Sequence, residues 1–170
     1  WWKGDTSSDE LDGHYFAYAI YHDLVADDAE RAEIRRYVAS ITDHILRHGY
    51  YYVGATGKPT TWGVWDPKKI NHDLKWYVDR GLNSLEMLSH LKVAEQLVGD
   101  PKYAAAAKDL IETHAYATNA IDQKILWPAS ELNHSDDELA FMAYYPLLQY
   151  ERDEHLRRVY LLSIERSWQI

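Results

Sequence analysis

Apolar and polar positions alternate with helical spacing along most of this sequence. Three segments open with a small polar residue followed three positions later by Glu, the spacing of a helix-capping box. They begin at Ser7, Asn83 and Ser135. Each precedes an apolar pattern with a period of about 3.6 residues. The pattern therefore predicts a helix at each of these positions.

A second helix is expected shortly after each of the three. Asp27 followed by Glu30 is a further capping pair, Gly99 and Pro101 mark the end of one helix and the start of the next, and Asp153 caps the last. The expected ranges are about 8–25, 27–48, 83–98, 102–116, 135–150 and 153–165. The sequence thus predicts an all-α fold of three antiparallel αα-hairpins, forming one domain over 1–170.

The connections within these hairpins are short, whereas those between them run from about 50 to 82 and from about 117 to 134. With this alternation, the long loops lie at one end of the bundle, where the first, third and fifth helices begin. Long loops in compact domains usually carry function. Within the first of them, the pattern over 50–66 predicts a small β-hairpin around Gly57.

Composition excludes several classes of protein. The chain has 27 acidic and 18 basic residues and a formal charge of -9, the wrong sign for binding nucleic acid. No apolar stretch reaches the roughly 18 residues that cross a membrane. Without cysteine there is no disulfide, thiolate nucleophile or Cys-based zinc site. Serine-hydrolase, phosphate-loop and HExxH zinc motifs are also missing.

Several phrases of the sequence resemble a known superfamily. The paired helices and these phrases are similar to the six-hairpin, (α/α)6-toroid superfamily of glycoside hydrolases and polysaccharide lyases, including uncharacterised bacterial proteins. The resemblance implies a toroid fold, carbohydrate chemistry and a secreted or periplasmic location. A full toroid needs six hairpins, so the chain is expected to be a fragment that pairs with the rest of its parent chain or another subunit. The phrases are 4–10 with Gly13-His14, 61–65, 80–86 and 133–139.

Glycoside hydrolysis usually needs two carboxyl groups, one of them protonated. Asp9 and Asp137 hold equivalent places in the repeated openings and are the first catalytic candidates. His14, four residues after Glu10, and His134, just before the third opening, could assist them. The alternatives are capping for the Glu residues, a helix-dipole role for the Asp residues and a buried structural role for His14.

The aromatic residues are seven Trp and fourteen Tyr but only two Phe. Trp and Tyr combine a flat apolar face with a polar edge, which suits sugars. Trp62, Trp65 and Trp76 are candidate stacking platforms, Asn71 a candidate hydrogen-bonding residue, and Arg80 a candidate ligand for the carboxylate of an acidic sugar. Alternatively, the tryptophans fix the long loop to the bundle and Arg80 pairs with a neighbouring carboxylate.

The first hypothesis is therefore a segment of a glycoside hydrolase or polysaccharide lyase that acts on an oligo- or polysaccharide. A noncatalytic helical module that binds glycan or scaffolds a larger protein is the alternative. A third possibility, a helical-repeat surface for protein binding, would show an apolar groove. No cofactor is required, although calcium held by Asp5, Asp9 and the 133–138 turn is conceivable.

Overall fold

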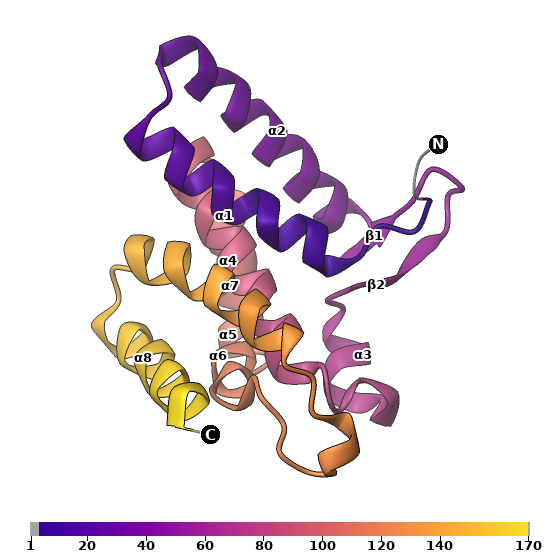
Figure 1. The fold of residues 1–170 in the computed structure, drawn as a ribbon. Helices are drawn as coiled ribbons and strands as arrows, with labels where there is room; N and C mark the ends of the chain where they lie inside the picture. The colour runs from indigo at the N-terminus through magenta and orange to yellow at the C-terminus, as the bar shows by residue number, and fades with distance from the viewer. Residues whose placement is uncertain (1–3, 170) are drawn as a thin grey trace.

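A computed structural model describes residues 4–169, apart from the side chain of Glu131. This part of the chain is mostly helical, with one small two-stranded sheet (Figure 1). The α-helices are α1 (Ser8–Leu24), α2 (Asp28–Arg47), α3 (Pro67–His72), α4 (Arg80–Val98), α5 (Pro101–Glu112), α6 (Tyr116–Asn119), α7 (Ser135–Tyr150) and α8 (Glu154–Gln169). Three 3₁₀ turns are η1 (Leu74–Trp76), η2 (Ala120–Asp122) and η3 (Ala129–Glu131).

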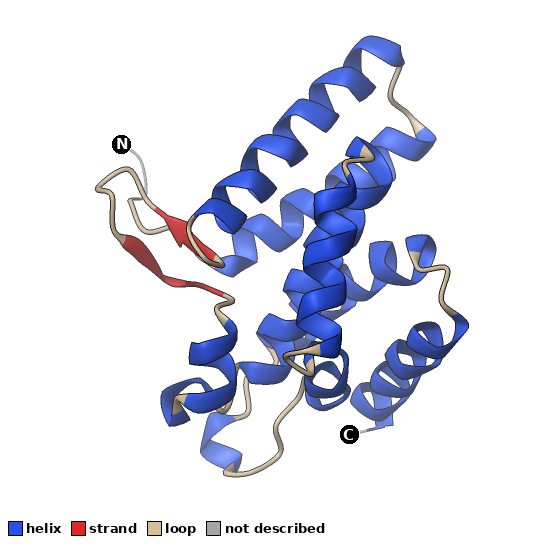
Figure 2. Ribbon diagram, turned by 180° about the vertical axis from the view of Figure 1, so that it is seen from behind, coloured by secondary structure: helices blue, strands red, loops and turns tan. Residues whose placement is uncertain are grey.

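The two strands form the predicted β-hairpin between α2 and α3. They are β1 (Tyr51–Val53) and β2 (Pro59–Val64), which pair antiparallel with Tyr51 opposite Val64. Figure 2 shows this hairpin in red at the edge of the helical body. It leads the chain from the end of α2 toward the start of α4. Trp62 and Trp65, on and just after β2, are thereby placed near the helices.

Two helix starts have the predicted capping boxes. The amide of Ser7 donates to the Glu10 carboxylate over 2.7 Å at the start of α1. At α2, the Asp27 carboxylate accepts from the amide of Glu30, and the Glu30 carboxylate accepts from the amide of Asp27, both over 2.9 Å. These bonds satisfy amides that the first helical turn leaves unpaired.

The capping boxes predicted at Asn83 and Ser135 are wrong. Helix α4 begins three residues earlier, at Arg80, and the Asn83 side chain donates instead to the carbonyl of Val64 over 2.9 Å. Ser135 is the first residue of α7 rather than its cap. At α7, the amide and hydroxyl of Ser135 donate to Oδ1 of Asn133 over 3.2 and 2.9 Å. Glu86 is consequently buried in α4, and Glu138 is exposed on α7.

Helix α4 runs through the middle of the molecule and packs against α1, α2, α5, α6 and α7 (Figures 1 and 2). It is buried on nearly all sides, as fully buried Leu85, Leu91 and Val93 illustrate. A helix surrounded in this way must bury its polar side chains too. None of the helices in the described part of the chain is both long and apolar enough to cross a membrane.

Candidate functional site

A cavity of about 180 Å³ lies where α1, α4 and α7 begin. The prediction that these three helices start beside one another is confirmed by its lining. Trp62 of β2 and Trp76 of η1 close the cavity on the side of the long loop. The helix starts contribute Ser7, Ser8, Asp9, Asp79, Leu82, Asn83, Asn133, Ser135, Asp136 and Leu139.

A second cavity of about 180 Å³ continues the first. The two share Trp62, Asp79, Asn133 and Asp136, and the second extends to Lys124. We refer to both together as the acidic cleft, because the carboxylates of Asp9, Asp79 and Asp136 face it. Its residues come from segments up to about 130 positions apart in the chain, so only the folded molecule assembles it.

Asp136 is the carboxylate whose chemistry the cleft changes most. Its Oδ1 accepts a hydrogen bond of 2.7 Å from the Asn133 side chain. Partial burial, together with the negative charges of Asp79, Asp9 and Asp137, raises its pKa to about 6. A carboxyl group with such a pKa can hold or release a proton near neutral pH, as a general acid or base must.

Trp62 supplies the accessible aromatic surface of the acidic cleft. Half of it is exposed, and it lines both cavities. The ring of Trp76, which is only 5% exposed, meets it edge to face at 6.3 Å between centroids. Trp76 therefore fixes the orientation of Trp62, whose free surface is available to a ligand. Both were candidate platforms, and both are in the cleft.

Trp65, the third candidate platform, has a different position. It is fully buried, and its Nε1 donates to Oε2 of Glu86 over 2.9 Å. The prediction of a stacking platform at Trp65 is wrong, because no face of its indole reaches solvent. Its alternation with Trp62 along the chain already places the two on opposite sides of an extended segment.

Asp137 and His134, predicted as catalytic, lie beside the acidic cleft without lining it. The Asp137 Oδ2 accepts from Lys124 Nζ over 2.7 Å and lies 3.6 Å from Nδ1 of His134. The neighbouring Asp136 faces the cleft in its place. One position along a helix turns the side chain by about 100°, so the adjacent Asp136 and Asp137 face different surroundings. Catalytic roles for Asp137 and His134 stay predictions.

His14 and Asn71 also lie outside the lining of the cleft. His14 is exposed on α1, where its ring stacks on Tyr18 at 5.7 Å. Asn71 donates to the carbonyl of His114 and accepts from Asn119, both over 2.8 Å. It therefore ties α3 to the segment after α5, a structural role that replaces the predicted contact with substrate.

A buried polar cluster beneath the acidic cleft was missed by the sequence reasoning. Oδ1 of Asp12 lies 2.9 Å from Nε2 of His90, and both side chains are almost completely buried. The His90 ring stacks on Tyr15 at 4.1 Å and meets the edge of Trp65. Glu86, one turn before His90, is part of the same cluster. The signal was present in the sequence as Glu86 and His90, four residues apart within an apolar stretch.

Burial dominates the protonation of this cluster. It raises the pKa of Glu86 and of Asp12 well above the usual carboxyl range, and each is raised further by neighbouring carboxylates. Burial also lowers the pKa of His90 to about 3. Among the described residues, Glu86 Oε1 and Asp12 Oδ2 have no hydrogen-bond partner. The cluster therefore favours protonated carboxyl groups at neutral pH.

Within residues 4–169, no group of three or more His, Asp or Glu side chains is arranged to hold a metal ion. Asp5, considered as a calcium ligand, accepts instead from the amide and hydroxyl of Thr61 over 2.8 and 2.7 Å. This bond pair fastens the start of the chain to β2. A calcium site that includes Asp9 and the 133–138 turn stays a prediction.

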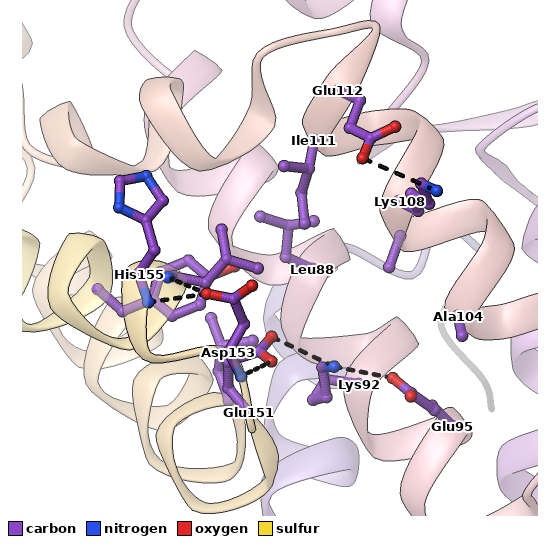
Figure 3. A pocket seen from close by; sticks show the side chains of 14 residues that line it. Leu88, Lys92, Glu95, Ala104, Lys108, Ile111, Glu112, Glu151, Asp153 and His155 are labelled. Atoms are coloured by element: carbon purple, nitrogen blue, oxygen red, sulfur yellow. Dashed lines mark hydrogen bonds and ion pairs between the residues drawn. The ribbon is translucent and has the colours of Figure 1, made fainter.

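A separate cavity of about 380 Å³ lies between α4, α5 and α8 (Figure 3). Most of its charged side chains are paired with one another. Lys92 bridges Glu95 and Glu151 at 2.8 and 3.2 Å, and the Asp153 carboxylate caps α8 by accepting from two backbone amides. Because these charges are already compensated, this cavity is a weaker candidate than the acidic cleft for recognising a polar ligand.

Comparisons of the chain with protein-family models, with curated proteins and with solved structures find no match. The acidic cleft combines an exposed indole with carboxylates from three helix starts.

Proposed function

We propose that the chain is a segment of a carbohydrate-active protein, of the glycoside hydrolase or polysaccharide lyase type, with its site in the acidic cleft. The observation that carries the proposal is the half-exposed Trp62 beside Asp136, whose pKa is raised to about 6. An indole face can stack on the apolar face of a sugar ring. A carboxyl group that retains its proton can donate it to the glycosidic oxygen.

The proposal assigns different roles to two carboxyl groups. Asp136, half-buried and protonated up to about pH 6, is the general acid. Asp9, exposed on the first turn of α1, is the base or nucleophile. Glycoside hydrolysis requires this division, with one carboxyl group that donates a proton and a second that acts as base or nucleophile. In a lyase, the Asp9 carboxylate would remove the proton on the carbon next to the uronate group.

The arrangement of helices supports the wider resemblance. Helices α1 and α2, α4 and α5, and α7 and α8 are joined by short turns and pack on each other. Three such pairs, with α1, α4 and α7 starting around one opening, are what half of an (α/α)6 toroid would contribute. Secretion or a periplasmic location belongs to the same proposal and follows from that resemblance.

A noncatalytic glycan-binding module is the second candidate, and the size of the cleft favours it. Each of its two cavities measures about 180 Å³, below the roughly 300 Å³ from which ligand pockets usually start. A cleft of this size holds one face of a sugar more readily than it encloses a reacting bond. In this function Trp62 would matter and Asp136 would not.

The test is a panel of neutral oligosaccharides, with binding measured by calorimetry and cleavage by product analysis. Trp62→Ala should weaken binding about tenfold, the effect of losing one aromatic contact. Trp168→Ala, which removes a still more exposed indole on α8, should leave it unchanged. Equal affinities for Trp62→Ala and the unsubstituted chain would refute the cleft as the binding site.

Catalysis is tested with Asp136→Asn. A general acid contributes about 100-fold or more, so the cleavage rate should fall by that factor. Cleavage by the unsubstituted chain should decline above about pH 6, because the acid then loses its proton. Asp28→Asn, on the exposed surface of α2, is the control. Binding without cleavage in every variant would support the noncatalytic module instead.

A further inference from the structure

A third cavity adjoins the acidic cleft and has the opposite charge. It measures about 340 Å³ and shares Lys124 and Ile125 with the cleft. Three cationic side chains line it, namely Arg80, Lys124 and Arg166, against the single carboxylate of Asp122. We call this cavity the basic arm. Such a concentration of positive charge is notable in a chain with a formal charge of -9.

Arg80 differs from the other two cationic residues of the basic arm, which both form ion pairs. Lys124 pairs with Asp137 at 2.7 Å and Arg166 with Asp122 at 3.1 Å. Within residues 4–169, the guanidinium of Arg80 forms no ion pair; it lies over the ring of Tyr77, 5.4 Å from its centroid. A guanidinium held on an aromatic face keeps its outer N–H groups free for a planar anion.

The wall of the basic arm depends on a close backbone contact. A Cβ at Gly81 would collide with the backbone carbonyl of Asp122, so α4 approaches η2 as closely as only glycine permits. This contact places Arg80, next to Gly81 in the chain, in the same cavity as Lys124, which follows η2. Trp127 and Tyr77, both substantially exposed, add aromatic surface to the same cavity.

We infer that the basic arm binds the carboxylate of a uronic acid, one or more sugar units away from the ring that stacks on Trp62. The inference rests on the proposed function and specifies its substrate as an acidic oligosaccharide. Arg80 donates two parallel N–H bonds to the sugar carboxylate, a geometry that guanidinium and carboxylate share. Lys124, at the junction of both regions, adds positive charge along the path.

Calorimetry with an oligogalacturonate and its fully methyl-esterified counterpart of equal length tests this inference. The unsubstituted chain should bind the acidic form about tenfold more tightly, the gain of one charge-assisted bidentate contact. Arg80→Gln should abolish that preference and leave binding of the neutral ester unchanged. Arg158→Gln, on the exposed surface of α8, is the matched control and should keep the preference.

Two further measurements keep the result independent of folding. Arg80→Lys retains the charge without the bidentate geometry, so it should keep only part of the preference. In the unsubstituted chain, salt should weaken binding of the acidic form and leave the ester unaffected. Circular dichroism should show native helix content in each variant.

The outcomes separate this inference from the proposed function. If both ligands bind equally and depend on Trp62, the inference fails and the proposed function stands. Acidic preference that persists in Arg80→Gln also overturns the inference. If neither ligand binds, nor any neutral oligosaccharide of the panel, both fail. If the acidic form binds through Arg80 and Trp62→Ala has no effect, the arm binds anions and the saccharide function fails.

Discussion

Glu86 lies in the interior of α4, with its carboxyl group out of contact with solvent and bonded to the indole of Trp65. Burying an ionised carboxylate costs several kcal/mol, so such a group keeps its proton instead. The nearby carboxyl of Asp12 adds to this effect. The buried carboxyl groups of Glu86 and Asp12 therefore favour their protonated forms.

This protonation predicts how stability depends on pH. Above the ordinary carboxyl pKa, Glu86 ionises in the unfolded chain while the folded chain keeps the proton. The free energy of unfolding then falls by about 1.4 kcal/mol per pH unit until the raised folded pKa is reached. Glu86→Gln removes this contribution, so the variant should match the unsubstituted chain near pH 4 and exceed its stability at pH 7.

Urea unfolding at several pH values measures the difference. Glu138→Gln, on an exposed side chain of α7, is the control and should follow the unsubstituted chain. If Glu86→Gln loses stability at pH 7, the carboxyl group is ionised in the folded chain and this account of the buried cluster is incorrect.

Sequence reasoning located the acidic cleft more accurately than its individual residues. Asp9, Trp62 and Trp76 were predicted as site residues and line it. The prediction named Asp137, whereas Asp136 lines the cleft. The repeated sequence identifies the first turn of α7 but does not say which side chain of that turn faces the cleft. The prediction for Trp65 was wrong because its indole packs against Glu86 and His90 of α4, and residue type alone does not reveal such a contact.

At the scale of elements, helix existence and most helix starts followed from periodicity and caps. The predicted caps are confirmed at α2, where Asp27 and Glu30 form a capping box, and at α8, where Asp153 accepts from two backbone amides. The capping prediction was wrong at Asn83, whose side chain donates a hydrogen bond to the carbonyl of Val64. A cap is predictable when its partners are its own neighbours, and tertiary contacts override it otherwise.

The contact of α4 with η2 makes a prediction about two glycines. Gly81→Ala should destabilise the chain by about 1–3 kcal/mol, because the added methyl group collides with the backbone of Asp122. Gly13→Ala, in the interior of α1 with open space around its Cβ position, should stabilise it by about 0.5–1 kcal/mol. Urea unfolding compares both with the unsubstituted chain.

The account requires that Gly81→Ala lowers the free energy of unfolding and that Gly13→Ala raises it. If Gly81→Ala were as stable as Gly13→Ala, α4 and η2 would lie further apart, and the wall of the basic arm would not be as described. Because Gly13→Ala makes the same chemical change in another helix, it controls for the intrinsic helix preference of alanine.

At the scale of the whole molecule, chain topology brings the starts of α1, α4 and α7 together. Each start contributes a carboxylate, and the long loop contributes the tryptophans. The alternation of short and long loops predicted this meeting. It left open which loop residues face inward, because that depends on packing across segments far apart in sequence.

The central claim is that the acidic cleft is where a saccharide binds, and the indole N–H signals of the seven tryptophans test it most directly. They should be followed by NMR while the tightest-binding oligosaccharide is added, with assignment by single Trp→Phe variants. The account predicts saturable shifts for Trp62 and Trp76, and none for Trp168 on α8. Shifts at Trp168 while Trp62 and Trp76 stay unchanged at saturation would contradict it.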